Sequence, residues 1–120
     1  MEKNNQKILI VDDSAFMRTV LKNILENIGY HNFVEAGNGN EALEKIKTDN
    51  PDLILLDIIM PDKGGVDVLK EIGLTHKVIM ITAVGQEKII EEAKNFGAKG
   101  YLVKPFDNHQ VESEVKKILG

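Results

Sequence analysis

Short apolar runs alternate along the chain with longer segments whose apolar residues recur every three or four positions, and this cycle repeats five times. The alternation predicts a succession of strand and helix pairs. Three runs contain no polar alternation, which is typical of parallel strands covered by helices on both faces. These strands are predicted at Ile8–Val11, Leu53–Leu56 and Val78–Ile81, with two weaker ones at Phe33–Ala36 and Tyr101–Val103.

Five helices are predicted between and after these strands. The first has one apolar stripe that ends before Gly29, and the fourth ends before Gly97, because glycine commonly follows the last residue of a helix. Asp107 and Gln110 form the pattern of a capping box at the start of the last helix. The second and third helices are expected at Asn40–Lys47 and Gly65–Ile72. The apolar stripes of the first, fourth and fifth helices extend over Met17–Ile28, Ile89–Phe96 and Val111–Leu119.

The repeated unit predicts an α/β fold. Five units are too few for an eight-stranded barrel, and right-handed crossovers then favour an open, doubly wound, five-stranded parallel sheet. A chain of 120 residues buries roughly two-thirds of its unfolded surface, which is enough for one core. No repeat or linker interrupts the pattern, so we expect residues 1–6 to be a polar N-terminal tail and residues 7–120 to be a single domain.

Composition narrows the classes of function. The chain has no cysteine, which excludes disulfide scaffolds and cysteine-ligated zinc or iron–sulfur sites. Its longest apolar run, Leu53 to Met60, is broken by Asp57 and is shorter than the roughly 20 residues of a membrane span. The first residues do not resemble a signal peptide, so a cytoplasmic protein without membrane insertion is expected. The 15 Lys and Arg residues against 19 Asp and Glu argue against nucleic acid as a partner.

Polar side chains stand where four of the predicted strands end. Asp12 and Asp13 follow the first strand, Asp57 ends the third, Thr82 the fourth and Lys104 the fifth. In open α/β sheets, ligands bind beyond the carboxyl ends of the strands. The five side chains are therefore expected to converge on one edge of the sheet.

Each of these side chains also has an ordinary explanation. Asp13 has the residue type of a helix N-cap, Thr82 suits a strand, and Lys104 suits a solvated surface. Asp57 is harder to explain, since it lies in the most hydrophobic segment and an unpaired buried carboxylate costs several kcal/mol. The combination is far less expected by chance than any single member, and it indicates a functional site.

Converging carboxylates repel one another unless a cation lies among them. Mg²⁺ takes oxygen ligands and is usually held by one or two carboxylates together with phosphate oxygens. Zinc and copper are disfavoured because His31, His76 and His109 are scattered along the chain and no cysteine is present. A metal, a hydroxyl and an ammonium around Asp57 suit phosphoryl transfer to a carboxylate nucleophile.

Four motifs, in their order and placement, resemble the receiver domain of bacterial-type response regulators. They are Ile8–Ser14, Asp57–Pro61, Ile81–Ala83 and Lys104–Phe106. The resemblance covers essentially the whole chain and implies a flavodoxin-like sheet with strand order 2-1-3-4-5 and five helices. The segments Asp13–Arg18 and Thr82–Gln86 further resemble the single-domain, CheY-like chemotaxis type.

Carried over onto the matching positions, the resemblance implies that Asp57 accepts the phosphoryl group. It further implies that Asp13, Asp57 and the backbone carbonyl of Ile59 ligate Mg²⁺, and that Asp12 assists through water. Lys104 would contact the phosphoryl group.

The resemblance also implies a switch. Thr82 would hydrogen-bond a phosphoryl oxygen, and Tyr101 would change its rotamer in response, although Tyr101 also fits an ordinary half-buried strand aromatic.

The Lys104-Pro105 peptide bond is often cis in this family. Gly64 replaces an aspartate that family members usually have in the loop after the phosphoacceptor. Glycine at a helix N-cap costs only a few tenths of a kcal/mol relative to aspartate, so we expect a looser loop with retained function.

The predicted function is a stand-alone response regulator of two-component signal transduction, of the chemotaxis type. A CheA-like histidine kinase would supply the phosphoryl group. The length leaves no room for an output domain after Gly120, so output is expected through protein contacts on the fourth helix, fifth strand and fifth helix, near Ile90. The target would be a protein such as a flagellar motor switch component.

By resemblance, Ile59 and Val84 border the path of the hydrolytic water, and neither can orient it, so slow self-dephosphorylation and a separate phosphatase are expected.

Three other classes remain as alternatives. A phosphatase of the haloacid dehalogenase type also uses an aspartate nucleophile with Mg²⁺, but it needs a second acidic residue where this chain has Ile59. A nucleotide or flavin carrier would need a Gly-rich loop after the first strand, where this chain has Asp12 and Asp13. A degenerate receiver is disfavoured because every acceptor-site residue is present. The chain is therefore expected to be a phosphoacceptor switch, not an enzyme.

Overall fold

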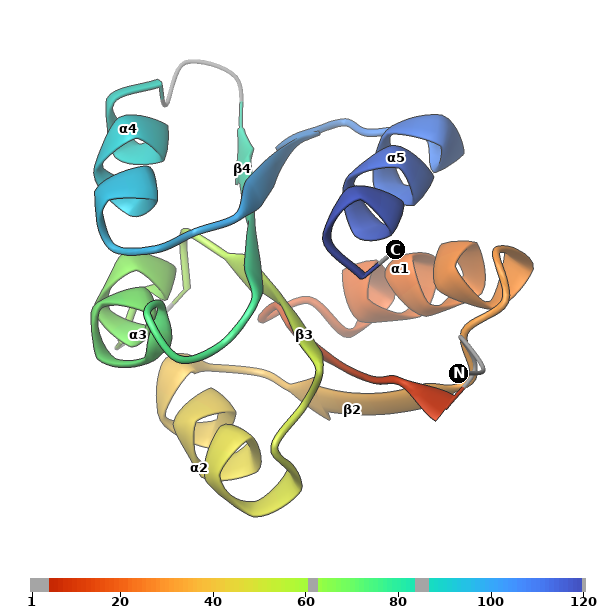
Figure 1. Ribbon diagram of the computed structural model, residues 1–120, viewed down its shortest axis with the longest axis horizontal. Helices are drawn as coiled ribbons and strands as arrows, with labels where there is room; N and C mark the ends of the chain where they lie inside the picture. Colours follow the sequence, from red (N-terminus) through yellow and green to blue (C-terminus); the bar gives the residue numbers. More distant parts are fainter. Residues whose placement is uncertain (1–4, 61–62, 84–86, 120) are drawn as a thin grey trace.

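The computed structural model of the chain describes residues 5–60, 63–83 and 87–119 (Figure 1). Five parallel strands form one sheet in the order β2-β1-β3-β4-β5, which confirms the expected doubly wound fold. The strands are β1 Lys7–Val11, β2 Asn32–Ala36, β3 Leu53–Asp57, β4 Val78–Ala83 and β5 Gly100–Lys104. The helices are α1 Ala15–Asn27, α2 Gly39–Asp49, α3 Gly65–Ile72, α4 Glu87–Asn95 and α5 Asn108–Leu119.

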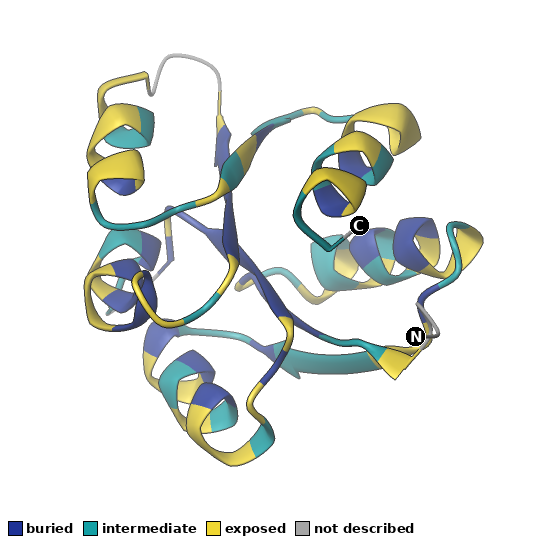
Figure 2. Cartoon of the chain, in the orientation of Figure 1, coloured by how far each residue is buried: buried dark blue, intermediate teal, exposed yellow. Residues whose placement is uncertain are grey.

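The helices form two layers, one on each face of the sheet. Helices α1 and α5 lie together on one face, and α2, α3 and α4 lie on the other (Figure 1). Along β3, Leu53 and Leu55 pack toward the first layer, whereas Ile54 and Leu56 pack toward the second. Every residue of β3 is buried, and Figure 2 shows it as a dark band through the centre of the molecule. This two-sided burial explains why the strand reads as a continuous apolar run that ends in Asp57.

The ends of the helices are set by local hydrogen bonds. The explanation of Asp13 as the N-cap of α1 is wrong, because Ser14 caps that helix and its hydroxyl accepts from the Met17 amide at 3.2 Å. The capping box of α5 is confirmed: the Asp107 amide donates to Gln110 at 2.9 Å and the Gln110 amide donates to Asp107 at 2.8 Å. Capping thus does not account for Asp13.

The C-terminal ends of α3 and α4 meet backbone against backbone. A Cβ atom added to Gly73 would overlap the carbonyl oxygen of Phe96, and one added to Gly97 would overlap the carbonyl oxygen of Gly73. Gly97 also has a φ of 103°, which favours glycine. The Lys70 ammonium lies 5.2 Å from the centre of the Phe96 ring and adds a cation–π contact between the two helices.

Among the described helices, none combines the length and the apolar character that crossing a membrane requires.

Candidate functional site: an acidic cluster at the sheet edge

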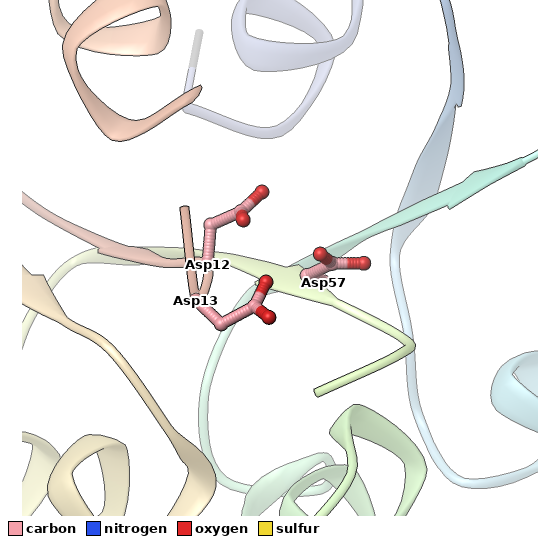
Figure 3. A group of neighbouring side chains, drawn as sticks. All are labelled: Asp12, Asp13 and Asp57. Carbon is pink, nitrogen blue, oxygen red and sulfur yellow. The ribbon is translucent and has the colours of Figure 1, made fainter. Parts of the chain in front are cut away.

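Three carboxylates converge at the carboxyl edge of the sheet. Asp12 and Asp13 follow β1 directly, and Asp57 is the last residue of the neighbouring strand β3 (Figure 3). One ligand oxygen from each side chain lies within 4.8 Å of those of the other two. Asp12 and Asp57 are buried, whereas Asp13 is exposed. The parallel arrangement of β1 and β3 therefore produces the convergence that the sequence predicts.

Hydrogen bonds from neighbouring groups hold the two buried carboxylates. The Ser14 amide donates to Asp12 Oδ1 at 2.9 Å, and the Ile59 amide donates to Asp57 Oδ1 at 3.2 Å. Lys104, at the end of β5, places its Nζ 3.5 Å from Asp12 Oδ2 and 3.3 Å from Asp57 Oδ2. Lys104 thus bridges the two carboxylates through the oxygens that the amides leave free.

The electrostatic environment disfavours the charged form of Asp57. Burial raises the pKa of its carboxyl, and the nearby charge of Asp12 raises it further. The Lys104 ammonium and the hydrogen bond from the Ile59 amide lower this pKa, but they do not cancel the increase. The cluster therefore carries more negative charge than its own lysine compensates.

The donor set fits a hard divalent cation. It consists of carboxylate oxygens, and the described residues of the cluster offer no nitrogen or sulfur ligand. A cation with a double charge would stabilise the charged form of Asp57 against the burial and the Asp12 charge that raise its pKa. The carboxylates that the sequence predicts as Mg²⁺ ligands are thus in one place.

The structure also places Thr82 and Tyr101, the two residues of the expected switch. Thr82 is buried in β4, and its hydroxyl donates to the carbonyl of Ala83 at 3.3 Å. Tyr101 lies in the neighbouring strand β5, where it pairs in register with Met80, two residues before Thr82. Its side chain is exposed, with the ring 5.7 Å from the Lys94 ammonium of α4. Tyr101 is therefore in an outward position.

Comparison with known proteins decides the family. The family model of the response regulator receiver domain matches residues 8–116. The chain belongs to this family. Its relatives include the chemotaxis protein CheY of Thermotoga maritima, 43% identical over 116 residues that cover 94% of this chain and 97% of the relative. The chemotaxis protein CheY of Bacillus subtilis has the same identity and the same coverage.

Solved structures agree with the family assignment. The structure of a CheX-CheY-BeF3-Mg+2 complex from Borrelia burgdorferi contains a chain that matches this one with a TM-score of 0.88 and 35% identity. The match covers 96% of this receiver domain and 90% of that chain. These findings do not favour the haloacid dehalogenase alternative.

The remaining features of the predicted receiver site have mixed outcomes. Gly64 is the N-cap of α3 and provides no side-chain cap, and the looser loop that its replacement of aspartate predicts stays a prediction. The Lys104-Pro105 peptide bond is cis. Ile90, which was expected on the output surface, is half-buried. Val84 lies outside the described residues.

One contributor to the receiver site was missed in the sequence. Arg18, on the first turns of α1, donates from a guanidinium nitrogen to the backbone carbonyl of Asp12 at 2.5 Å. Its spacing of one helical turn from Ser14 was the available signal, since such a side chain can reach back to the residues before the helix. Its second partner, Glu35 of β2, depends on the sheet topology and had no local signal.

Proposed function

We propose that this receiver domain is a phosphoacceptor switch of two-component signal transduction, and that it works in chemotaxis. A histidine kinase of the CheA type supplies the phosphoryl group, and Asp57 accepts it. The observation that supports this proposal is a buried carboxylate at the end of the central strand with two further carboxylates and an ammonium around it. Similarity to CheY proteins over nearly the whole chain supports the chemotaxis pathway.

The proposed reaction is an in-line displacement at phosphorus. An oxygen of the Asp57 carboxylate forms a bond to phosphorus while the bond from phosphorus to the imidazole nitrogen of the kinase breaks, and the electron pair leaves with the imidazole. Lys104 offers its ammonium to the negative oxygens of the transferred group, beside the carboxylate that it already contacts at 3.3 Å. The Ile59 amide holds the other oxygen of Asp57 and so orients the nucleophile.

Asp13, Asp57 and the backbone carbonyl of Ile59 are the proposed Mg²⁺ ligands, with Asp12 acting through water. When bound, the ion neutralises the charge that develops on the phosphoryl oxygens. The presence of Mg²⁺ in the CheX-CheY complex from Borrelia burgdorferi supports this choice of metal. The exposed side chain of Ile59 does not interfere, because only its backbone would be a ligand.

Output is proposed through the surface formed by α4, β5 and α5. This face contains a hollow whose lining includes Lys94, Tyr101, His109, Glu114 and Lys117. A hydrogen bond from Thr82 to the incoming phosphoryl group would let Tyr101 turn inward and change this face. A flagellar motor switch component is the proposed target, in the cytoplasm. A separate phosphatase is proposed as well, because neither Ile59 nor Val84 can orient a hydrolytic water. The CheX-CheY complex from Borrelia burgdorferi shows that a similar receiver chain binds a second protein.

Intact mass after incubation with acetyl phosphate and Mg²⁺ tests the proposal. The expected result is a gain of one phosphoryl group that is lost in the Asp57→Asn variant and in EDTA. Asp67→Asn is the matched control, since Asp67 is an exposed aspartate in the first turn of α3 and lies outside the cluster. Normal labelling of the Asp57→Asn variant would refute the assignment. Steady hydrolysis of p-nitrophenyl phosphate with many turnovers would instead support a phosphatase.

A further inference from the structure

Arg18 connects the end of β1 to β2. One guanidinium nitrogen donates to the carbonyl oxygen of Asp12 at 2.5 Å, and Nε donates to Glu35 Oε1 at 2.8 Å. The side chain is only 19% exposed, so both bonds are largely shielded from water. The planar guanidinium is thus fixed between a backbone carbonyl and a carboxylate.

Glu35 is itself held in place from a second side. Lys22, one turn further along α1, places its Nζ 2.8 Å from Glu35 Oε2. The hydrogen bonds and charges of Lys22 and Arg18 lower the pKa of the Glu35 carboxyl, with the Lys22 hydrogen bond as the largest cause. Glu35 therefore stays ionised at neutral pH and gives Arg18 a permanent anchor.

The carbonyl that Arg18 holds belongs to the peptide group joining Asp12 to Asp13. The Asp12 carboxylate has its own restraints from Ser14 and Lys104. Among the described residues, the Asp13 carboxylate has no hydrogen-bond or ion-pair partner. The direction in which Asp13 projects therefore depends on the orientation of the backbone at the peptide that Arg18 holds.

We propose that Arg18 is a positioning residue for the Mg²⁺ site: it fixes the peptide between Asp12 and Asp13 and thereby aims the Asp13 carboxylate at the metal. This inference rests on the metal site of the proposed function. Groups that orient a ligand without touching the metal typically contribute a factor of about 10–100 in metal affinity. Arg18 contributes in this way from outside the acidic cluster.

The direction in which Mg²⁺ affinity changes when Arg18 is replaced distinguishes positioning from simple electrostatics. A fixed positive charge near a cation site repels the cation, so removal of the Arg18 charge alone would make Mg²⁺ bind more tightly. Loss of positioning has the opposite effect, because Asp13 is then free to turn away. Weaker binding after removal of a nearby cation is therefore a result that electrostatics does not produce.

Calorimetric titration with Mg²⁺ of the full chain tests the inference in four proteins: the parent, Arg18→Met, Arg18→Lys and Lys22→Met. We expect Arg18→Met to bind Mg²⁺ about tenfold more weakly than the parent. Arg18→Lys keeps the charge but replaces the two separate guanidinium nitrogens by a single ammonium nitrogen, so we expect an intermediate affinity. Lys22→Met is the matched control, since it removes the same charge and an ion pair with Glu35 but leaves both hydrogen bonds of Arg18, to the Asp12 carbonyl and to Glu35, in place. We expect it to bind as tightly as the parent or more tightly.

Thermal melting in EDTA accompanies the titrations and identifies variants that lose the fold. Arg18→Met binding as tightly as the parent, or more tightly, would overturn the inference. An equal loss of affinity in Lys22→Met would also overturn it, since general weakening of the β2 region would then be the cause. If Arg18→Met does not fold, Arg18→Lys decides: parent-like Mg²⁺ affinity contradicts positioning by the guanidinium. A parent that binds no Mg²⁺ refutes the proposed metal site itself, and the inference with it.

Discussion

Lys104 and Asp57 form an ion pair across 47 positions of sequence, with 3.3 Å between Nζ and Oδ2. The pair joins the ends of β5 and β3, which are separated in the sheet by β4. Even so, the pKa of the Asp57 carboxyl is raised, because burial and the charge of Asp12 outweigh the lysine. The ion pair therefore reduces the electrostatic repulsion in the site without removing it. An excess of negative charge remains, which a bound cation would neutralise.

This imbalance predicts a pH dependence of stability in the absence of Mg²⁺. Because the pKa of Asp57 is raised on folding, the native chain binds more protons than the unfolded chain between the ordinary pKa of aspartate and the raised value. The contribution of Asp57 to the free energy of unfolding is therefore greatest at low pH and falls as pH rises through this window. Asp57→Asn lacks this contribution.

Thermal melting of the parent and of Asp57→Asn across the acidic range measures the effect. The parent is expected to lose stability relative to the variant as pH rises toward neutrality. A difference in melting temperature between the two proteins that stays constant with pH would mean that burial does not destabilise the charged form of this carboxyl.

The acidic cluster also predicts opposite effects on metal-free and metal-bound stability. Asp13→Asn removes one of the repelling charges and should raise the melting temperature in EDTA, by about 4 °C for each kcal/mol of relief. Mg²⁺ at about 100 times its dissociation constant should stabilise the parent by about 2.7 kcal/mol, and the variant by much less. Asp67→Asn, outside the cluster, should keep the full response to Mg²⁺. Indifference of the parent to Mg²⁺ would argue against convergence of the three carboxylates around a metal.

The switch can be tested at Thr82. Thr82→Ala should keep phosphorylation of Asp57 largely intact. Phosphorylation should no longer change the rotamer of Tyr101, because the hydroxyl that hydrogen-bonds the phosphoryl group is missing. We expect partner binding by the phosphorylated form to weaken by at least about fivefold. The ring resonances of Tyr101 on addition of acetyl phosphate and Mg²⁺ provide a readout that needs no partner. Thr82→Ser restores the hydroxyl and should restore the shift, whereas an unchanged response in Thr82→Ala would contradict the relay.

The lifetime of the phosphorylated form is expected to depend on Ile59. Its side chain is 61% exposed beside Asp57 and has no group that can orient a hydrolytic water. Ile59→Asn should speed hydrolysis by about tenfold, or roughly 1.4 kcal/mol of barrier, with Mg²⁺ affinity nearly unchanged. Decay of the phosphorylated mass after removal of the phosphodonor measures this rate. The double variant with Val84→Asn extends the test, and if it decays at the parent's rate, water access at these positions does not set the lifetime.

Most of the fold could be predicted from the sequence because a strand buried on both faces of the sheet is a continuous apolar run in the sequence. All of β3 is buried, so its apolar run and the single carboxylate at its end stand out among the residues of the chain. The gathering of Asp12, Asp13 and Asp57 follows from the rule that parallel strands end at one edge. The family assignment is likewise confirmed. These features depend on periodicity and topology, which are properties of whole segments.

The errors and omissions concern single residues and their individual contacts. Two neighbouring residues, Asp13 and Ser14, both have the residue type of an N-cap, and only the backbone geometry selects Ser14. The contact of Arg18 with Glu35 joins residues 17 positions apart and requires knowing which face of α1 meets β2. The exposure of Tyr101 depends on its rotamer and on Lys94 of α4, neither of which a strand pattern encodes.

The glycine contact between the ends of α3 and α4 limits how α4 can move. Because Gly73 and Gly97 are in backbone contact, the C-terminal end of α4 has little room to move, and we expect any displacement of the helix to be a rotation about that end. A nine-residue helix is about 13 Å long, so a swing of about 10° would carry Glu87 roughly 2 Å while Lys94 hardly moves. We therefore expect the contact between Tyr101 and Lys94 to be broken by rotation of the tyrosine and not by displacement of the helix.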